Sequence, residues 1–145
     1  MNKISIVTLS RFSAVFAQCY DALERFAPGF RKILVLDEGG REGAQFYTQG
    51  WEVVRVERPF SISLNQNIGL MAAWPDDVLY VCDDIKLLGP DVEELQRIAY
   101  LDPDIGILSP RIYGSIGHSV QSAQGKNIVG EYQLTTKELC SPCWF

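Results

Sequence analysis

Two kinds of apolar pattern alternate along the first 110 residues of the chain. Short runs rich in β-branched residues predict strands, and longer segments with apolar residues every three or four positions predict helices with one buried face. The expected strands are residues 4–9, 32–36, 52–57, 78–82 and 105–108. The expected helices run from Ser13 to the Pro28-Gly29 stop, from Ser63 to Ala73, and from Gly89-Pro90 to Asp102, with a weaker one at residues 42–49.

The order of these elements predicts the fold class. Ser13 and Ser63 are suited to cap the first turns of their helices, and Pro28-Gly29 ends the first helix. Strands that alternate with helices in this way favour an α/β fold with a largely parallel, doubly wound sheet. After Pro110 the sequence turns polar and glycine-rich, so residues 111–138 are expected to form irregular loops with short strands. We therefore expect an α/β core over residues 1–110 and an extension of the same domain over residues 111–145.

The strongest candidate for chemistry is the pair Asp83-Asp84, which follows the continuous apolar run 78–82. Such a run is typical of a strand covered on both faces, and open α/β sheets bind ligands at the carboxyl ends of these strands. Two adjacent carboxylates repel one another unless a proton or a cation lies between them. A divalent ion that also holds phosphate oxygens would satisfy them. By contrast, Asp76-Asp77 before the same strand is better explained as a turn.

Other polar residues could join this pair at the same end of the sheet. Asp37 follows the second strand, but with Glu38 and two glycines after it an ordinary loop start is an equally good explanation. Asn65 and Asn67 lie on the 63–73 helix, where asparagine is a poor helix former, so their amides could cap the helix or face a cleft. Gly69 on that helix would allow another backbone to approach closely.

Composition and motifs exclude several classes of function. The chain has 145 residues, 47% hydrophobic and 21% charged, which suits a single globular domain. A net charge of -5 argues against a nucleic-acid partner. No apolar run is long enough for a transmembrane segment and no signal-peptide pattern is present, so a cytoplasmic location is expected. No GxGxxG, GxxxxGK[ST] or GxSxG motif occurs. Cys140 and Cys143 form a CxxC without a second pair, and their role stays open.

Five segments, in order, resemble the family 2 glycosyltransferases with the GT-A fold, and in particular the rhamnosyltransferase-like members. ISIVTLSR at residues 4–11 resembles the opening strand of that family, and ILVLDEGG at residues 33–40 resembles its second strand and acidic turn. FSISLNQNIG at 60–69 is similar to its FSFARAxNxG segment, and LYVCDDI at 79–85 to its LLFLNDDV version of the DxD motif. DPDIGILSPR at 102–111 resembles the strand that follows.

This resemblance implies a GT-A (Rossmann-like) three-layer sandwich with a mostly parallel central sheet. It also implies transfer of a sugar from a UDP- or dTDP-sugar donor to a glycan or other hydroxyl acceptor, with inversion at the anomeric carbon. Asp84 would bind a divalent metal, Mn²⁺ or Mg²⁺, with help from Asp83. The donor would be contacted by Thr8, Ser10, Asp37, Asn67, Gly69 and Asp83. Cys82 stands at the first position of the metal-binding motif and departs from the family.

Residues 140–145 resemble the start of the strand that leads into the acceptor half of the family. No residue matches the catalytic acid of that half, so the resemblance implies an N-terminal donor-binding part without acceptor elements, and the catalytic residue is unassigned. The alternative from another class is a non-catalytic, truncated or degenerate, nucleotide or nucleotide-sugar binding module. A dinucleotide-binding Rossmann domain is disfavoured by the missing glycine motif. A homo-oligomer is compatible with the sequence.

Overall fold

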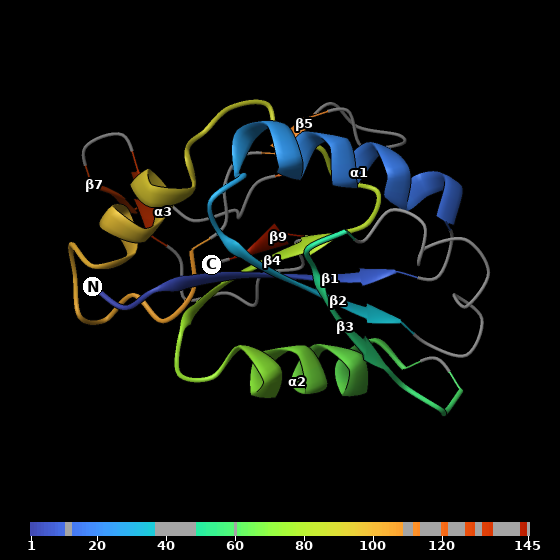
Figure 1. Cartoon of the computed structure of the whole chain (residues 1–145). Helices are drawn as coiled ribbons and strands as arrows, with labels where there is room; N and C mark the ends of the chain where they lie inside the picture. Colours follow the sequence, from blue (N-terminus) through green and yellow to red (C-terminus); the bar gives the residue numbers. More distant parts are fainter. Residues whose placement is uncertain are drawn as a thin grey trace.

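The protein is an α/β sandwich of three layers, with a sheet between helices (Figure 1). The computed structural model describes residues 1–10, 13–36, 49–59, 61–108, 112–113, 120–121, 127–129, 132–134 and 143–144. Helix α1 (Ser13–Phe26) lies on one face of the sheet and α2 (Ile62–Ala73) on the other, and α3 (Val92–Ala99) adds to the α1 side. The predicted α/β class is confirmed.

Four parallel strands form the centre of the sheet. These are β1 (Ile4–Ser10), β2 (Arg31–Leu36), β3 (Glu52–Arg55) and β4 (Asp77–Cys82), and β9 (Cys143–Trp144) pairs antiparallel with β4. The strand order is β3-β2-β1-β4-β9. Beyond residue 110, β5 (Ile112–Tyr113) pairs with β6 (Val120–Gln121), and β7 (Asn127–Val129) with β8 (Tyr132–Leu134). The expectation of short strands in this part is therefore confirmed.

The strand order reverses direction at β1. From β1 the chain passes through α1 to β2 and β3 on one side, and then through α2 to β4 on the other side of β1. Ligands of open α/β sheets bind in the crevice outside the carboxyl ends of the strands at such a reversal. The carboxyl ends of β1 and β4 are thus the place where the fold itself favours a binding site.

The face of the sheet toward α1 and α3 holds the larger apolar core. Alternate strand residues point to this face because side chains in a strand alternate between its two sides. Phe16 and Leu23 of α1 pack there against Leu34 and Leu79 of the sheet, and Val92 joins them from α3. All five side chains are almost completely buried, so this layer anchors β1, β2 and β4 firmly.

The opposite face packs closely against α2. Gly69 lies on the buried side of this helix, and a Cβ atom there would overlap Val7 Cγ1 and lie 3.2 Å from Val35 Cγ2. A glycine at this position therefore lets the helix approach β1 and β2 more closely than any other residue would allow. Close packing between α2 and the sheet therefore accounts for a glycine at position 69.

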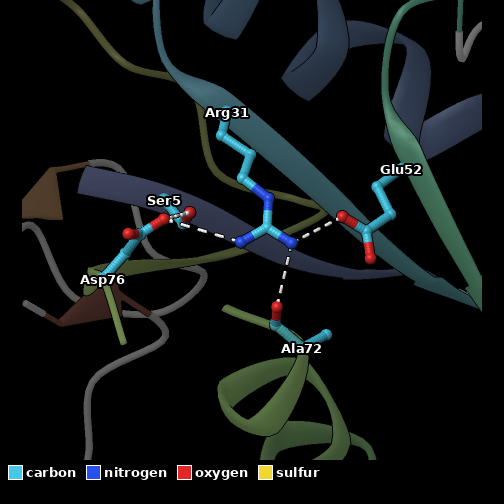
Figure 2. Close-up of polar contacts among 5 residues, drawn as sticks. All are labelled: Ser5, Arg31, Glu52, Ala72 and Asp76. Atoms are coloured by element: carbon cyan, nitrogen blue, oxygen red, sulfur yellow. Dashed lines mark hydrogen bonds and ion pairs between the residues drawn. The ribbon is translucent and has the colours of Figure 1, made fainter. Parts of the chain in front are cut away.

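An arginine ties several elements together at the amino end of the sheet (Figure 2). Arg31 Nη2 donates to Glu52 Oε2 of β3 at 2.7 Å and to the Ala72 carbonyl of α2 at 2.9 Å. Its Nη1 lies 3.5 Å from Asp76 Oδ2, which accepts a 2.6 Å hydrogen bond from Ser5 Oγ. A cation beside the last carbonyls of a helix is favourable, so Arg31 joins α2, β2, β3 and the turn before β4.

Asp77 is likewise held by protein donors. Its carboxylate accepts from Asn2 Nδ2 at 3.1 Å, Gln96 Nε2 at 2.7 Å and the Tyr100 hydroxyl at 3.1 Å. The acid pair Asp76-Asp77 is thus part of the structural turn that the sequence indicated.

Several predicted boundaries are wrong. Helix α2 begins at Ile62 with Ser61, not Ser63, as its N-cap, because Ser61 is extended and its Oγ accepts from the Leu64 N–H at 3.4 Å. Strand β3 ends at Arg55, two residues before its predicted end. Residues 105–108 form no strand, since β9 takes the place beside β4 where a further strand would pair. The weak helix at 42–49 falls almost entirely outside the described residues.

Candidate functional site

A tight turn carries the acid pair at the carboxyl end of β4. The Ile85 N–H donates to the Cys82 carbonyl at 3.1 Å, which closes a four-residue turn with Asp83 and Asp84 at its two central positions. The same carbonyl accepts a 3.7 Å hydrogen bond from the Cys19 thiol of α1. We call residues 82–85 the acidic turn. Its backbone is held both by its own hydrogen bond and from the α1 side.

One hydrogen bond joins the acidic turn to β1. Ser10 Oγ, at the last position of β1, donates to Asp83 Oδ2 at 2.9 Å. Ser10 is only 4% exposed, and β1 and β4 are neighbours across the reversal of strand order. The hydrogen bond therefore spans the point of the sheet at which a ligand-binding crevice is expected.

Asp84 differs from the other acids that flank β4. It is exposed and, within the described part of the chain, makes no hydrogen bond or ion pair. At the opposite end of the strand, Asp76 is hydrogen-bonded to Ser5 and ion-paired with Arg31. Asp77 accepts hydrogen bonds from protein donors that include Gln96. Of the two acid pairs, the one at the carboxyl end thus offers a carboxylate to a ligand.

The surroundings of the Cys82 thiol show what this side chain does in the fold. The thiol packs on the α2 face, where it donates to the Tyr80 hydroxyl at 3.6 Å. Burial raises the pKa of the Cys82 thiol, and the negative charges of Asp84 and Asp83 raise it further. A thiol with a raised pKa stays protonated at neutral pH and is a poor metal ligand, because thiolate is the ligating form. The side chain of Cys82 is therefore a packing group of β4.

The remaining predicted residues lie in different surroundings. Thr8 is 0% exposed, and its Oγ1 makes no hydrogen bond within the described part of the chain, so it lies in the core and not at an open surface. Gly69 lies in the helix–sheet contact, and Asn67 is exposed on α2. Asp37 falls outside the described residues. Of the predicted donor contacts, the structure brings Ser10 and Asp83 together.

Two supporting residues were not predicted. Gln66 of α2 is hydrogen-bonded to the Tyr80 hydroxyl, and burial raises the pKa of that tyrosine well above its ordinary value. The Cys19 thiol of α1 donates to the Cys82 carbonyl of the acidic turn. The spacing of Cys19 on the buried face of its helix was the one available signal, and nothing in the sequence indicated its partner.

The carboxylate oxygens of the acidic turn are ligands of the kind that hard divalent cations prefer. Among the described residues no group of three or more His, Cys, Asp and Glu side chains is arranged to hold a metal ion. The acidic turn carries two carboxylates, of which Asp83 accepts the hydrogen bond from Ser10. Mg²⁺ typically binds through one or two carboxylates while phosphate and water oxygens complete its shell. Mn²⁺ accepts the same oxygen ligands. The turn therefore supplies two ligands for such an ion, and water or phosphate oxygens would complete its shell.

Comparisons with known proteins give no independent assignment. Neither the models of known protein families nor the curated protein sequences contain a match to this chain. None of the helices in the described segments combines the length and the apolar character needed to cross a membrane.

Proposed function

We propose that the protein is a glycosyltransferase of the GT-A type that takes a sugar from a nucleoside diphosphate sugar donor. The donor would lie at the carboxyl ends of β1 and β4, with its diphosphate beside the acidic turn. The observation that supports this most is the Ser10–Asp83 hydrogen bond, which joins an acid pair with an exposed Asp84 to the reversal of strand order. The motif order described above supplies the choice of substrate class.

Each acid has a distinct part in this proposal. Asp84 would hold a divalent cation, Mn²⁺ or Mg²⁺, and Asp83 would support it from a fixed orientation. When bound, the cation neutralises the charge that develops on the diphosphate leaving group. Asp37 would hydrogen-bond the nucleobase, as the resemblance implies. Sugar transfer also requires a general base for the acceptor hydroxyl, and that residue is unassigned.

The proposal is tested by calorimetric titration with UDP, dTDP and NAD, each with and without Mn²⁺. A second assay measures release of UDP from UDP-glucose and of dTDP from dTDP-rhamnose. We expect UDP or dTDP to bind only with the metal, EDTA to reverse the binding, and NAD not to bind. Slow release of UDP or dTDP from the donor would support sugar transfer.

The outcomes separate the two candidate functions. Metal-dependent binding without turnover of any donor or acceptor would replace the transferase by a nucleotide-sugar binding module. Absence of any binding to either nucleotide, with or without the metal, would contradict both. NAD binding that does not need a metal would favour the dinucleotide-binding fold instead.

A further inference from the structure

We infer that Ser10 is a positioning residue, which fixes the Asp83 carboxylate so that Asp83 and Asp84 present their oxygens to one cation. The inference rests on the proposed function and assigns Ser10 a part different from the direct donor contact that the resemblance implied. Three features of the structure support it: the single proton of the Ser10 hydroxyl, the hydrogen bonds that hold the backbone of the acidic turn, and the strand register that puts Ser10 beside Asp83.

The hydroxyl group of Ser10 already donates its hydrogen bond to a protein acceptor. A serine hydroxyl has one proton to donate, and that of Ser10 is directed to Asp83 Oδ2 at 2.9 Å. With 4% of the residue exposed, little of it is left for a ligand to contact. Ser10 therefore acts on a ligand through Asp83 and not directly.

Hydrogen bonds hold the backbone at the start of the acidic turn, and the bond from Ser10 acts on the Asp83 side chain. The Cys82 carbonyl accepts both from the Ile85 N–H and from the Cys19 thiol, so the start of the turn is held on two sides. Pairing of Leu9 with Cys82 puts Ser10 beside Asp83 in register. Groups that hydrogen-bond a metal ligand set its orientation, and their loss typically weakens metal binding about 10–100-fold.

The same strand contains a matched control at its other end. Ser5 Oγ donates to Asp76 Oδ2 at 2.6 Å, and Ser5 is 0% exposed. Ser5 and Ser10 are thus both buried serines of β1 that hydrogen-bond an aspartate flanking β4. Loss of either hydroxyl removes one buried hydrogen bond and is expected to lower the stability of the fold. Only the loss of Ser10 is expected to change metal binding.

The test uses Mn²⁺ alone as the probe, followed by electron paramagnetic resonance of the free ion. Ser10→Thr and Ser10→Val have the same shape and differ in the hydroxyl, and Ser5→Ala controls for lost stability. We expect Ser10→Thr and Ser5→Ala to bind Mn²⁺ like the parent, and Ser10→Val to bind about 10-fold more weakly. Thermal unfolding of each variant shows that the folded protein is being compared.

Two results would overturn the inference. The first is equal Mn²⁺ affinity of Ser10→Thr and Ser10→Val. The second is a loss of affinity in Ser5→Ala as large as that in Ser10→Val, because a general loss of stability would then explain both. A parent protein that binds no Mn²⁺ overturns the proposed metal site itself, and the part of Ser10 falls with it, so the two failures are distinguishable.

Discussion

Replacing Asp84 by asparagine is expected to weaken metal-dependent binding of UDP or dTDP by about 100-fold or more, equivalent to about 2.7 kcal/mol. Asparagine keeps the size of the side chain but removes the negative charge that a divalent cation requires. Because Asp84 is exposed and makes no hydrogen bond or ion pair within the described part of the chain, the folded protein should lose little stability. Calorimetric titration and thermal unfolding of the same preparation measure both effects.

The matched control is Asp21→Asn, which changes the net charge by the same amount on the exposed side of α1. It should leave the nucleotide affinity unchanged, which separates a ligand at the acidic turn from a general electrostatic effect of the acidic protein. An Asp84→Asn protein that binds the nucleotide and metal as tightly as the parent would show that Asp84 holds no metal. Equal weakening by the two variants would point to overall charge.

Replacing Gly69 by alanine is expected to destabilise the fold by about 1–2 kcal/mol. Overpacking of a buried contact costs about 1–3 kcal/mol, and the better helix propensity of alanine returns up to about 1 kcal/mol. The new Cβ would overlap Val7 Cγ1, which belongs to a buried β-branched residue with little room to move. Denaturant unfolding measures the loss, and nucleotide binding by the folded fraction should be retained.

Two variants check that close packing is the cause. Gly29→Ala has no atom within 4 Å of its new Cβ, so its stability should match the parent within about 0.5 kcal/mol. Combining Gly69→Ala with Val7→Ala removes the overlapping methyl group, and the two losses should then be less than additive. Full stability with lost nucleotide binding in Gly69→Ala would contradict the packing explanation and restore the donor contact that the family motif implied.

Much of the fold was predictable because its elements follow from local patterns. The apolar runs of β1, β2 and β4 and the spacing in α1 appear in the structure close to their predicted ranges. Residues 105–108 have a strand-like pattern as well, yet the partner of β4 is β9, which lies far along the sequence. Local pattern indicates that a segment can form a strand, but whether a neighbour is available depends on the whole sheet.

The position of the candidate site in the fold was predictable from the sequence, but the contacts of its residues were not. The carboxyl ends of parallel strands meet at one end of a sheet, and this rule was enough to single out Asp83 and Asp84. Thr8 and Ser10 are two residues apart and lie on the same side of β1, yet Ser10 reaches Asp83 whereas Thr8 is enclosed by the core. Their depth depends on register and on the helices above them, which no single sequence segment contains.

Paramagnetic broadening by Mn²⁺ in nuclear magnetic resonance spectra tests the central claim most directly. β4 carries an acid pair at each end, so the protein contains its own comparison between the acidic turn and Asp76-Asp77. With UDP or dTDP present, and Mg²⁺ as the diamagnetic reference, we predict that Mn²⁺ broadens the backbone amide signals of Ser10, Asp83 and Ile85 and spares those of Arg31 and Asp77. Broadening centred on Asp77, or equal at both ends of β4, would contradict a metal-bound nucleotide at the acidic turn.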